Sequence, residues 1–225
     1  MSFRRLNLIL FCCVLLSIGI VSWLPESTFF SGFEKPWQLQ PFANEDSLST
    51  AYKKEYRILN KVPVLWQLND TTGTIAIILI DAWGVPLDES RMAAEFSIFK
   101  DLPHDFALHQ RLANRTEHAE NVEWKGDFIK VACDSCSDAK KIVVLDSLIS
   151  QKAGERFALI AQESRYGDMN ALHNVLSSVA TIAKKHPECK FIVQGTHRPI
   201  LGAPEVRRLH KSHWVPVVLL NAKFD

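Results

Sequence analysis

The sequence predicts an α/β protein whose mostly parallel sheet is flanked by helices, with one transmembrane helix at the N-terminus. Two observations predict the sheet. From Thr74 onward short apolar runs alternate with helical stretches, and "IAIILI" (75–80) is apolar at every position, as in a strand buried on both faces. A third observation predicts the transmembrane helix: residues 6–24 contain no charged side chain.

The uncharged N-terminal run is long enough to cross a bilayer, since about 20 apolar residues suffice for a helix. Arg4 and Arg5 precede it and Glu26 follows it, which places the N-terminus inside and the rest of the chain on the extracytoplasmic side. A cleaved signal peptide is the alternative, because Ser17 and Gly19 offer small residues at a cleavage-like spacing. Either segment exports the remainder of the chain.

The chain therefore divides into an anchor or signal peptide (1–24), a linker that packs on the domain (25–73) and an α/β domain (74–225). Within the domain, acids at the N-terminus and helical spacing of apolar residues predict helices over 88–100 and 168–186. The predicted strands are the apolar runs 74–80, 127–133, 141–145, 156–162, 190–195 and 214–220, with an edge strand at 62–68.

Charge and cysteine content narrow the function classes. The formal net charge is +1, with basic and acidic residues interspersed, so no electrostatic footprint for nucleic acid is present. Cys133 and Cys136 form a CxxC pair, which in an exported domain favours a structural disulfide. Free thiols, a redox pair and half of a zinc site are the alternatives, and the redox pair would make the chain a thiol oxidoreductase.

Three segments carry polar residues that a purely structural sheet does not need. Asp81 ends the buried strand at 75–80, "NRTEHAE" (114–120) surrounds Thr116, and "QGTHRP" (194–199) places His197 directly after another strand. A buried carboxylate is costly without a partner, and ligands of open parallel sheets bind where strands end. These segments are therefore candidates for one site.

In this order of motifs the chain resembles the alkaline phosphatase superfamily, particularly its sulfatase-like and membrane-anchored phosphoglycol or phosphoethanolamine transferase branches. The resemblance covers residues 75–220 through "AIILID", "RTEHAE", "QGTH" and "HWVPVVLL". It implies that Asp81, Thr116 and His197 bind a divalent metal, zinc or manganese, and that Thr116 is the nucleophile. Arg115 and Arg198 would then bind the charged oxygens of the substrate.

The resemblance implies an extracytoplasmic, membrane-anchored, metal-dependent hydrolase or transferase of phosphate or sulfate esters, lipid-linked esters included. Its partners would be that ester and the membrane. The family's Asp-His pair reads Thr196-His197 here, and Asp168 and His173 are the nearest candidates for further ligands. The alternative is therefore a catalytically inactive relative that acts as a binding or assembly subunit of an envelope complex.

Overall fold

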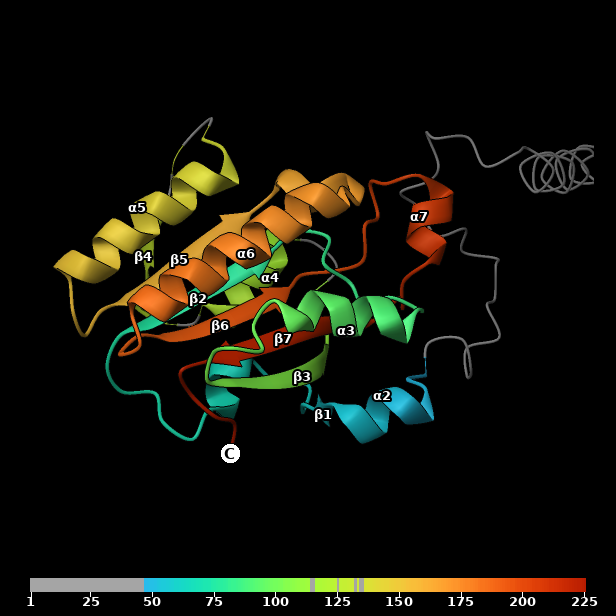
Figure 1. Ribbon diagram of the computed structural model, residues 1–225, viewed down its shortest axis with the longest axis horizontal. Coiled ribbons are helices and arrows are strands. Elements are labelled where there is room, and N and C mark those ends of the chain that lie inside the picture. The colour runs from blue at the N-terminus through green and yellow to red at the C-terminus, as the bar shows by residue number, and fades with distance from the viewer. Residues whose placement is uncertain (1–46, 114–115, 125, 132, 134–135) are drawn as a thin grey trace, which may run out of the picture. The chain divides into compact units, whose positions relative to one another are not determined.

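The computed structural model describes residues 47–113, 116–124, 126–131, 133 and 136–225. Within these residues seven strands form one sheet in the order β1-β3-β7-β6-β2-β5-β4 (Figure 1). Neighbouring strands are parallel except at β7, which runs antiparallel to both β3 and β6. The strands are β1 (Arg57–Ile58), β2 (Ile75–Ile80), β3 (His104–Gln110), β4 (Ile129–Lys130), β5 (Arg156–Ala161), β6 (Lys190–Gly195) and β7 (Trp214–Leu220). The predicted α/β class with a mostly parallel sheet is confirmed.

Helices cover both faces of the sheet, and successive side chains of β2 alternate between the two faces. Ala76, Ile78 and Ile80 pack in one apolar cluster with side chains of α2, α3, α5 and α6. The alternate residues of β2 pack in a second cluster with η1, α4 and Phe224. Figure 1 shows α3, α5 and α6 together over one face. The bounds are α2 (Thr50–Glu55), η1 (Val64–Gln67), α3 (Glu89–Ser97), α4 (Thr116–Glu123), α5 (Asp138–Gln151), η2 (Glu163–Tyr166), α6 (Met169–Lys185) and α7 (Pro204–Arg208).

Two predicted strands are wrong. The run 141–145 lies inside helix α5, where Ile142, Leu145 and Ile149 are buried at helical spacing while Val143 is 66% exposed. The run 62–68 contains the 3₁₀ helix η1 over Val64–Gln67, and the Gln67 side chain bonds both the N–H and the carbonyl of Asn60, which closes a loop. Short apolar runs do not distinguish strands from buried helical turns, which explains both errors.

Other predicted elements are found, some with different bounds. Helices α3 and α6 lie within the predicted ranges and begin at capping residues Asp88 and Asp168. The predicted strand at 127–133 is shortened to the two residues of β4. Strands β1 and β3 were not predicted. Strand β1 pairs with β3, and Tyr52 and Tyr56 are buried. The described part of the predicted linker therefore contributes a strand and core side chains to the fold.

No helix among the described residues is long and apolar enough to cross a membrane. The predicted anchor, residues 6–24, lies outside the described residues, so it stays a prediction. Cys133 and Cys136 form a disulfide in the segment between β4 and α5. A disulfide is the state expected for this pair if the domain is exported. Cys189 is a free thiol with no exposed surface.

The buried His109 generates a prediction about pH. Its Nε2–H donates to the carbonyls of Asn60 and Val62, and burial lowers its pKa from 6.5 to about 4. Between these two values the unfolded chain binds a proton that the folded chain does not, so stability falls as the pH falls. His109→Gln keeps a donor and removes this titration, so urea unfolding between pH 6.5 and 4 should give a shallower pH dependence, by up to about 1.4 kcal/mol per pH unit. An unchanged dependence of the unfolding free energy on pH would contradict the lowered pKa of His109. Some dependence should remain in the variant, because burial also lowers the pKa of His210 to about 4.

The cysteines generate a second prediction. Burial raises the pKa of Cys189 to about 12, and only the thiolate reacts with alkylating agents. Iodoacetamide followed by peptide mapping should therefore find Cys133, Cys136 and Cys189 unmodified in the native protein. Of these three, unfolding without a reductant should expose only Cys189, and adding a reductant should expose the other two. Modification of Cys133 and Cys136 without reductant would show that they are thiols.

Candidate functional site

Asp81 directly follows strand β2 and is 7% exposed. Its backbone N–H donates to the carbonyl of Ala161 at the end of β5 (2.8 Å), and its carbonyl accepts a hydrogen bond from Ser164 Oγ (2.7 Å). Residue 81 also continues the alternation of Ile75, Ile77 and Leu79, whose side chains pack on the α4 side of the sheet. The carboxylate therefore ends the interior strand β2 on the face that α4 covers.

His197 reaches Asp81 from the neighbouring strand. Strand β6 pairs with β2 in parallel, and the N–H of Thr196, the first residue after β6, donates to the Ile80 carbonyl (3.1 Å). The next residue, His197, is 5% exposed, and its Nδ1–H donates to the carbonyl of Arg198 (2.7 Å). This bond leaves Nε2 directed at Asp81, 3.1 Å from Oδ1. The two predicted ligands thus meet because their strands are adjacent.

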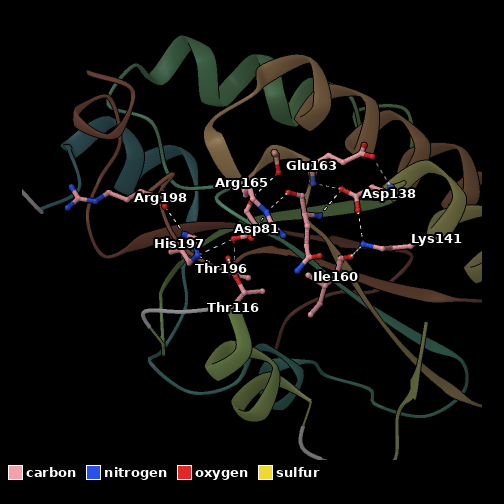
Figure 2. A network of polar contacts seen from close by, with 12 residues as sticks. Asp81, Thr116, Asp138, Lys141, Ile160, Glu163, Arg165, Thr196, His197 and Arg198 are labelled. Atoms are coloured by element: carbon pink, nitrogen blue, oxygen red, sulfur yellow. Dashed lines mark hydrogen bonds and ion pairs between the residues drawn. The ribbon is translucent and has the colours of Figure 1, made fainter. Parts of the chain in front are cut away.

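Thr116 is the first residue of α4 and completes the cluster. Its Oγ1 donates to Asp81 Oδ1 (2.9 Å) and lies 3.4 Å from His197 Nε2 and 3.5 Å from Thr196 Oγ1 (Figure 2). The structure therefore brings Asp81, Thr116 and His197 together at the ends of β2, β6 and the start of α4.

A buried carboxylate fixes α4 against the sheet. Glu123, at the last position of the helix, is 3% exposed and accepts hydrogen bonds from Gln194 Nε2 of β6 and from the N–H of Val64 (both 3.0 Å). Burial raises the pKa of Glu123, partly offset by these two donors. Because α4 is tied to β6 in this way, the position of Thr116 depends on the same strand that carries His197.

Arg165 is a site residue that the sequence did not reveal. It lies in η2, directly after β5, and its Nε is 4.0 Å from Asp81 Oδ2 with 36% of the side chain exposed. The segment "AQESRYG" has no distinctive motif, and only the pairing of β5 with β2 brings it to this edge of the sheet. A partly exposed guanidinium is suited to bind an oxyanion.

The electrostatics of the cluster centre on Asp81. Burial by itself raises the pKa of this carboxyl. The hydrogen bond and charge of His197, the hydroxyl of Thr116 and the charge of Arg165 outweigh burial and hold the pKa of Asp81 below its usual value. Asp81 is therefore an ionised acceptor at neutral pH.

Two glycines allow the turns after β2 and β6 to touch. A Cβ on Gly195 would lie 1.8 Å from the carbonyl oxygen of Trp83, and a Cβ on Gly84 would lie 2.7 Å from the Cα of Arg198. The turn after β2 is strained, since Ala82 has a φ of 62°. The sequence "DAWG" after the buried strand thus lets the backbone that carries Asp81 lie against the backbone that carries His197.

Of the two arginines predicted to bind substrate, Arg198 is not part of this cluster. Arg198 points away from Asp81 in Figure 2, and its Nη1 donates to Ser212 Oγ (2.9 Å). Arg115 lies outside the described residues, immediately before Thr116. Of the described arginines that follow a strand end, Arg165 is the one directed at Asp81.

The donor set fits one cation with further water ligands and does not fit two. Because Nδ1 of His197 donates to a carbonyl, Nε2 is the nitrogen that faces the Asp81 carboxylate, and either a proton or a metal ion can lie between these two groups. Among the described residues, however, no three His, Cys, Asp or Glu side chains are grouped as metal ligands. Asp168, a candidate for a second ion, accepts hydrogen bonds from Asn170 and Ala171 as the cap of α6.

The contact between the two turns generates a prediction. Gly195→Ala forces its methyl group into the Trp83 carbonyl, so it should destabilise the fold by about 3 kcal/mol or more in urea unfolding. Gly73→Ala is the control, since its Cβ meets nothing within 4 Å and only its φ of 76° is strained, which costs about 1 kcal/mol. Equal losses would mean that the turns do not press on each other as described.

Comparison with family models gave no match, and comparison with curated proteins gave none either. Comparison with solved structures found similarity to a protein of Vibrio parahaemolyticus described as belonging to the alkaline phosphatase superfamily. The match covers 88% of this chain and 68% of that one, with 12% sequence identity and a TM-score of 0.43.

Proposed function

We propose that the chain is a metal-dependent hydrolase or transferase of phosphate or sulfate esters, with Thr116 as its nucleophile. The observation that carries the proposal is the position of one hydroxyl. Thr116 Oγ1 lies at the first residue of a helix, donates to an ionised carboxylate and is 3.4 Å from a histidine nitrogen. A threonine hydroxyl is a poor nucleophile unless a base or a cation withdraws its proton, and both kinds of help can act here.

In the proposed first step Thr116 Oγ1 attacks the phosphorus or sulfur atom of the ester. A bond forms between Oγ1 and that atom, the bond to the ester oxygen breaks, and the Thr116 proton passes to Asp81. The leaving alcohol takes up a proton from solvent. Water or an acceptor alcohol then attacks the phosphorus or sulfur and gives up its proton to solvent, the bond to Thr116 Oγ1 breaks, and Asp81 returns its proton to Oγ1, which restores the hydroxyl. Water as acceptor makes the chain a hydrolase, and another alcohol makes it a transferase.

Two groups beside Thr116 can bind the transferred anion. The first turn of α4 presents backbone N–H groups that no helical carbonyl satisfies, an arrangement that binds phosphate and sulfate. The Arg165 guanidinium lies on the other side of Asp81 and is partly exposed. The positive charge of Arg165 and the oriented N–H groups of α4 would thus stabilise the negative charge that develops on the transferred group.

Asp81, His197 and Thr116 would hold the single cation, zinc or manganese, that the donor set fits. A bound divalent ion would supply Lewis-acid polarisation of the ester and would lower the pKa of the threonine hydroxyl. Localisation follows the sequence prediction: an anchor at 6–24, the domain outside the cytoplasm, and a substrate that includes lipid-linked esters.

The nucleophile is tested by turnover of p-nitrophenyl phosphate and p-nitrophenyl sulfate with zinc or manganese. Thr116→Ala should reduce kcat about 10³-fold or more, while Thr116→Ser keeps the attacking oxygen and most of the activity. Thr72→Ala is the matched control, because Thr72 also donates to an aspartate, Asp70 (2.7 Å), but does so on the exposed surface. Mass spectrometry of the quenched reaction should find the phosphoryl or sulfuryl group on Thr116. Full activity of Thr116→Ala would end the proposal.

The cation has its own readout. Zinc or manganese should raise the melting temperature of the wild type, because a ligand that binds only the folded state stabilises it. Asp81→Asn and His197→Ala should abolish this increment, and Thr116→Ala should keep most of it, since a neutral hydroxyl is a weak ligand. An increment that survives loss of Asp81 would place the metal elsewhere.

The second candidate is a catalytically inactive relative that binds an anionic ligand as part of an assembly. The sparse donor set favours it, because the described residues around Asp81 add only hydroxyls to one carboxylate and one imidazole. This candidate is selected if the wild type binds inorganic phosphate but turns over neither ester with either metal.

A further inference from the structure

The start of η2 is capped by a residue of another helix. The N-cap position of η2, Gln162, makes no side-chain capping bond of its own. Instead Asp138, the first residue of α5, accepts hydrogen bonds from the N–H groups of Gln162 and Glu163 through Oδ2, each at 2.7 Å (Figure 2). Helix α5 does not need this carboxylate, because Ser137 already caps it through the N–H of Lys140.

The Asp138 carboxylate is 1% exposed, so its charge must be compensated inside the protein. Lys141 Nζ donates to Asp138 Oδ1 (3.0 Å) and also to the carbonyl of Ile160 on β5 (3.1 Å). The contact is reciprocal, since the N–H of Asp138 donates to Glu163 Oε1 (3.3 Å). One buried ion pair therefore ties the beginnings of α5 and η2 to the end of β5.

The residues that Asp138 holds are those that direct η2 at the candidate site. The carbonyl of Gln162 accepts hydrogen bonds from the backbone N–H of Arg165 (3.2 Å) and from its Nε (3.3 Å). The same Nε lies 4.0 Å from Asp81 Oδ2. Ser164, between them, donates to the Asp81 carbonyl. A continuous set of contacts thus runs from Asp138 through Gln162 to Arg165 and Asp81.

We infer that Asp138 is a positioning residue: it holds η2 so that the Arg165 guanidinium stays beside Asp81 and binds the transferred anion. The assignment of the anion rests on the function proposed above, whereas the positioning of η2 does not. An alanine at 138 leaves two backbone N–H groups at the start of η2 without their acceptor. Arg165 then loses its fixed anchor although neither Arg165 nor Asp81 is changed.

The positioning is tested by hydrogen exchange of the Gln162 and Glu163 amides. Both should exchange at least about tenfold faster in Asp138→Ala, because each loses a bond to a charged acceptor, and Asp138→Asn should be intermediate because its carbonyl still accepts. Asp88→Ala is the matched control: it removes the cap of α3, freeing Ser90 N–H, and should leave Gln162 and Glu163 unchanged. If Asp138→Ala does not fold, Asp138→Asn must show the faster exchange. Unchanged exchange in a folded variant overturns the inference.

Binding of inorganic phosphate, measured by calorimetry, tests the consequence for the site. Asp138→Ala and Arg165→Ala should each raise Kd about tenfold, and the double variant should be no weaker than Arg165→Ala within about twofold, since both remove the same contact. Asp138→Asn should recover most of the affinity, and Asp88→Ala should bind as the wild type does. Additive losses would mean that Asp138 acts elsewhere. A wild type that binds neither phosphate nor sulfate would refute the proposed function, and the exchange experiment would still decide the positioning role.

Discussion

The candidate site depends on the parallel pairing of β2 with β6 on one side and with β5 on the other. Parallel strands end at the same edge of a sheet, so the residues that follow each of them meet there. Asp81 follows β2, His197 comes soon after β6, and Arg165 follows β5. Asp81 and His197, more than a hundred residues apart in sequence, therefore become neighbours because backbone hydrogen bonds align their strands.

Buried carboxylates fix the rigid elements around this edge. Asp81, Glu123 and Asp138 are each less than 10% exposed, and each carboxylate contacts at least two polar groups: Thr116 and His197 at Asp81, Gln194 and Val64 at Glu123, and Gln162 and Glu163 at Asp138. Removing charge from water is costly, and such groups persist where partners are fully oriented. Here Glu123 connects α4 to β6, and Asp138 connects α5 to η2. Both contacts lead to elements whose residues face Asp81, so these buried carboxyl groups help to set the geometry of the site.

The close approach of the turns sets a second constraint. Gly84 and Gly195 leave room for backbone atoms where a Cβ would collide, so β2 and β6 can deliver their following residues within hydrogen-bond distance. The strained φ of Ala82 accompanies this arrangement. Packing at the turns and hydrogen bonding at the strands thus reinforce each other, and the position of Thr116 follows because α4 is bonded to β6.

The sequence by itself determined the α/β class, the buried strand β2, the helices α3 and α6, and the identity of Asp81, Thr116 and His197 as candidate site residues. These are local signals: full apolarity, helical spacing with a capping acid, and a polar residue directly after a strand. Only the tertiary structure decided that 141–145 is helical, since burial on one side of α5 selects among the patterns that the run allows. It also decided that Arg165 faces Asp81 while Arg198 contacts Ser212, because strand order and turn geometry depend on contacts between distant segments. The role of Asp138 has the same origin: its carboxylate caps a segment more than 20 residues away, a relation that no local pattern encodes.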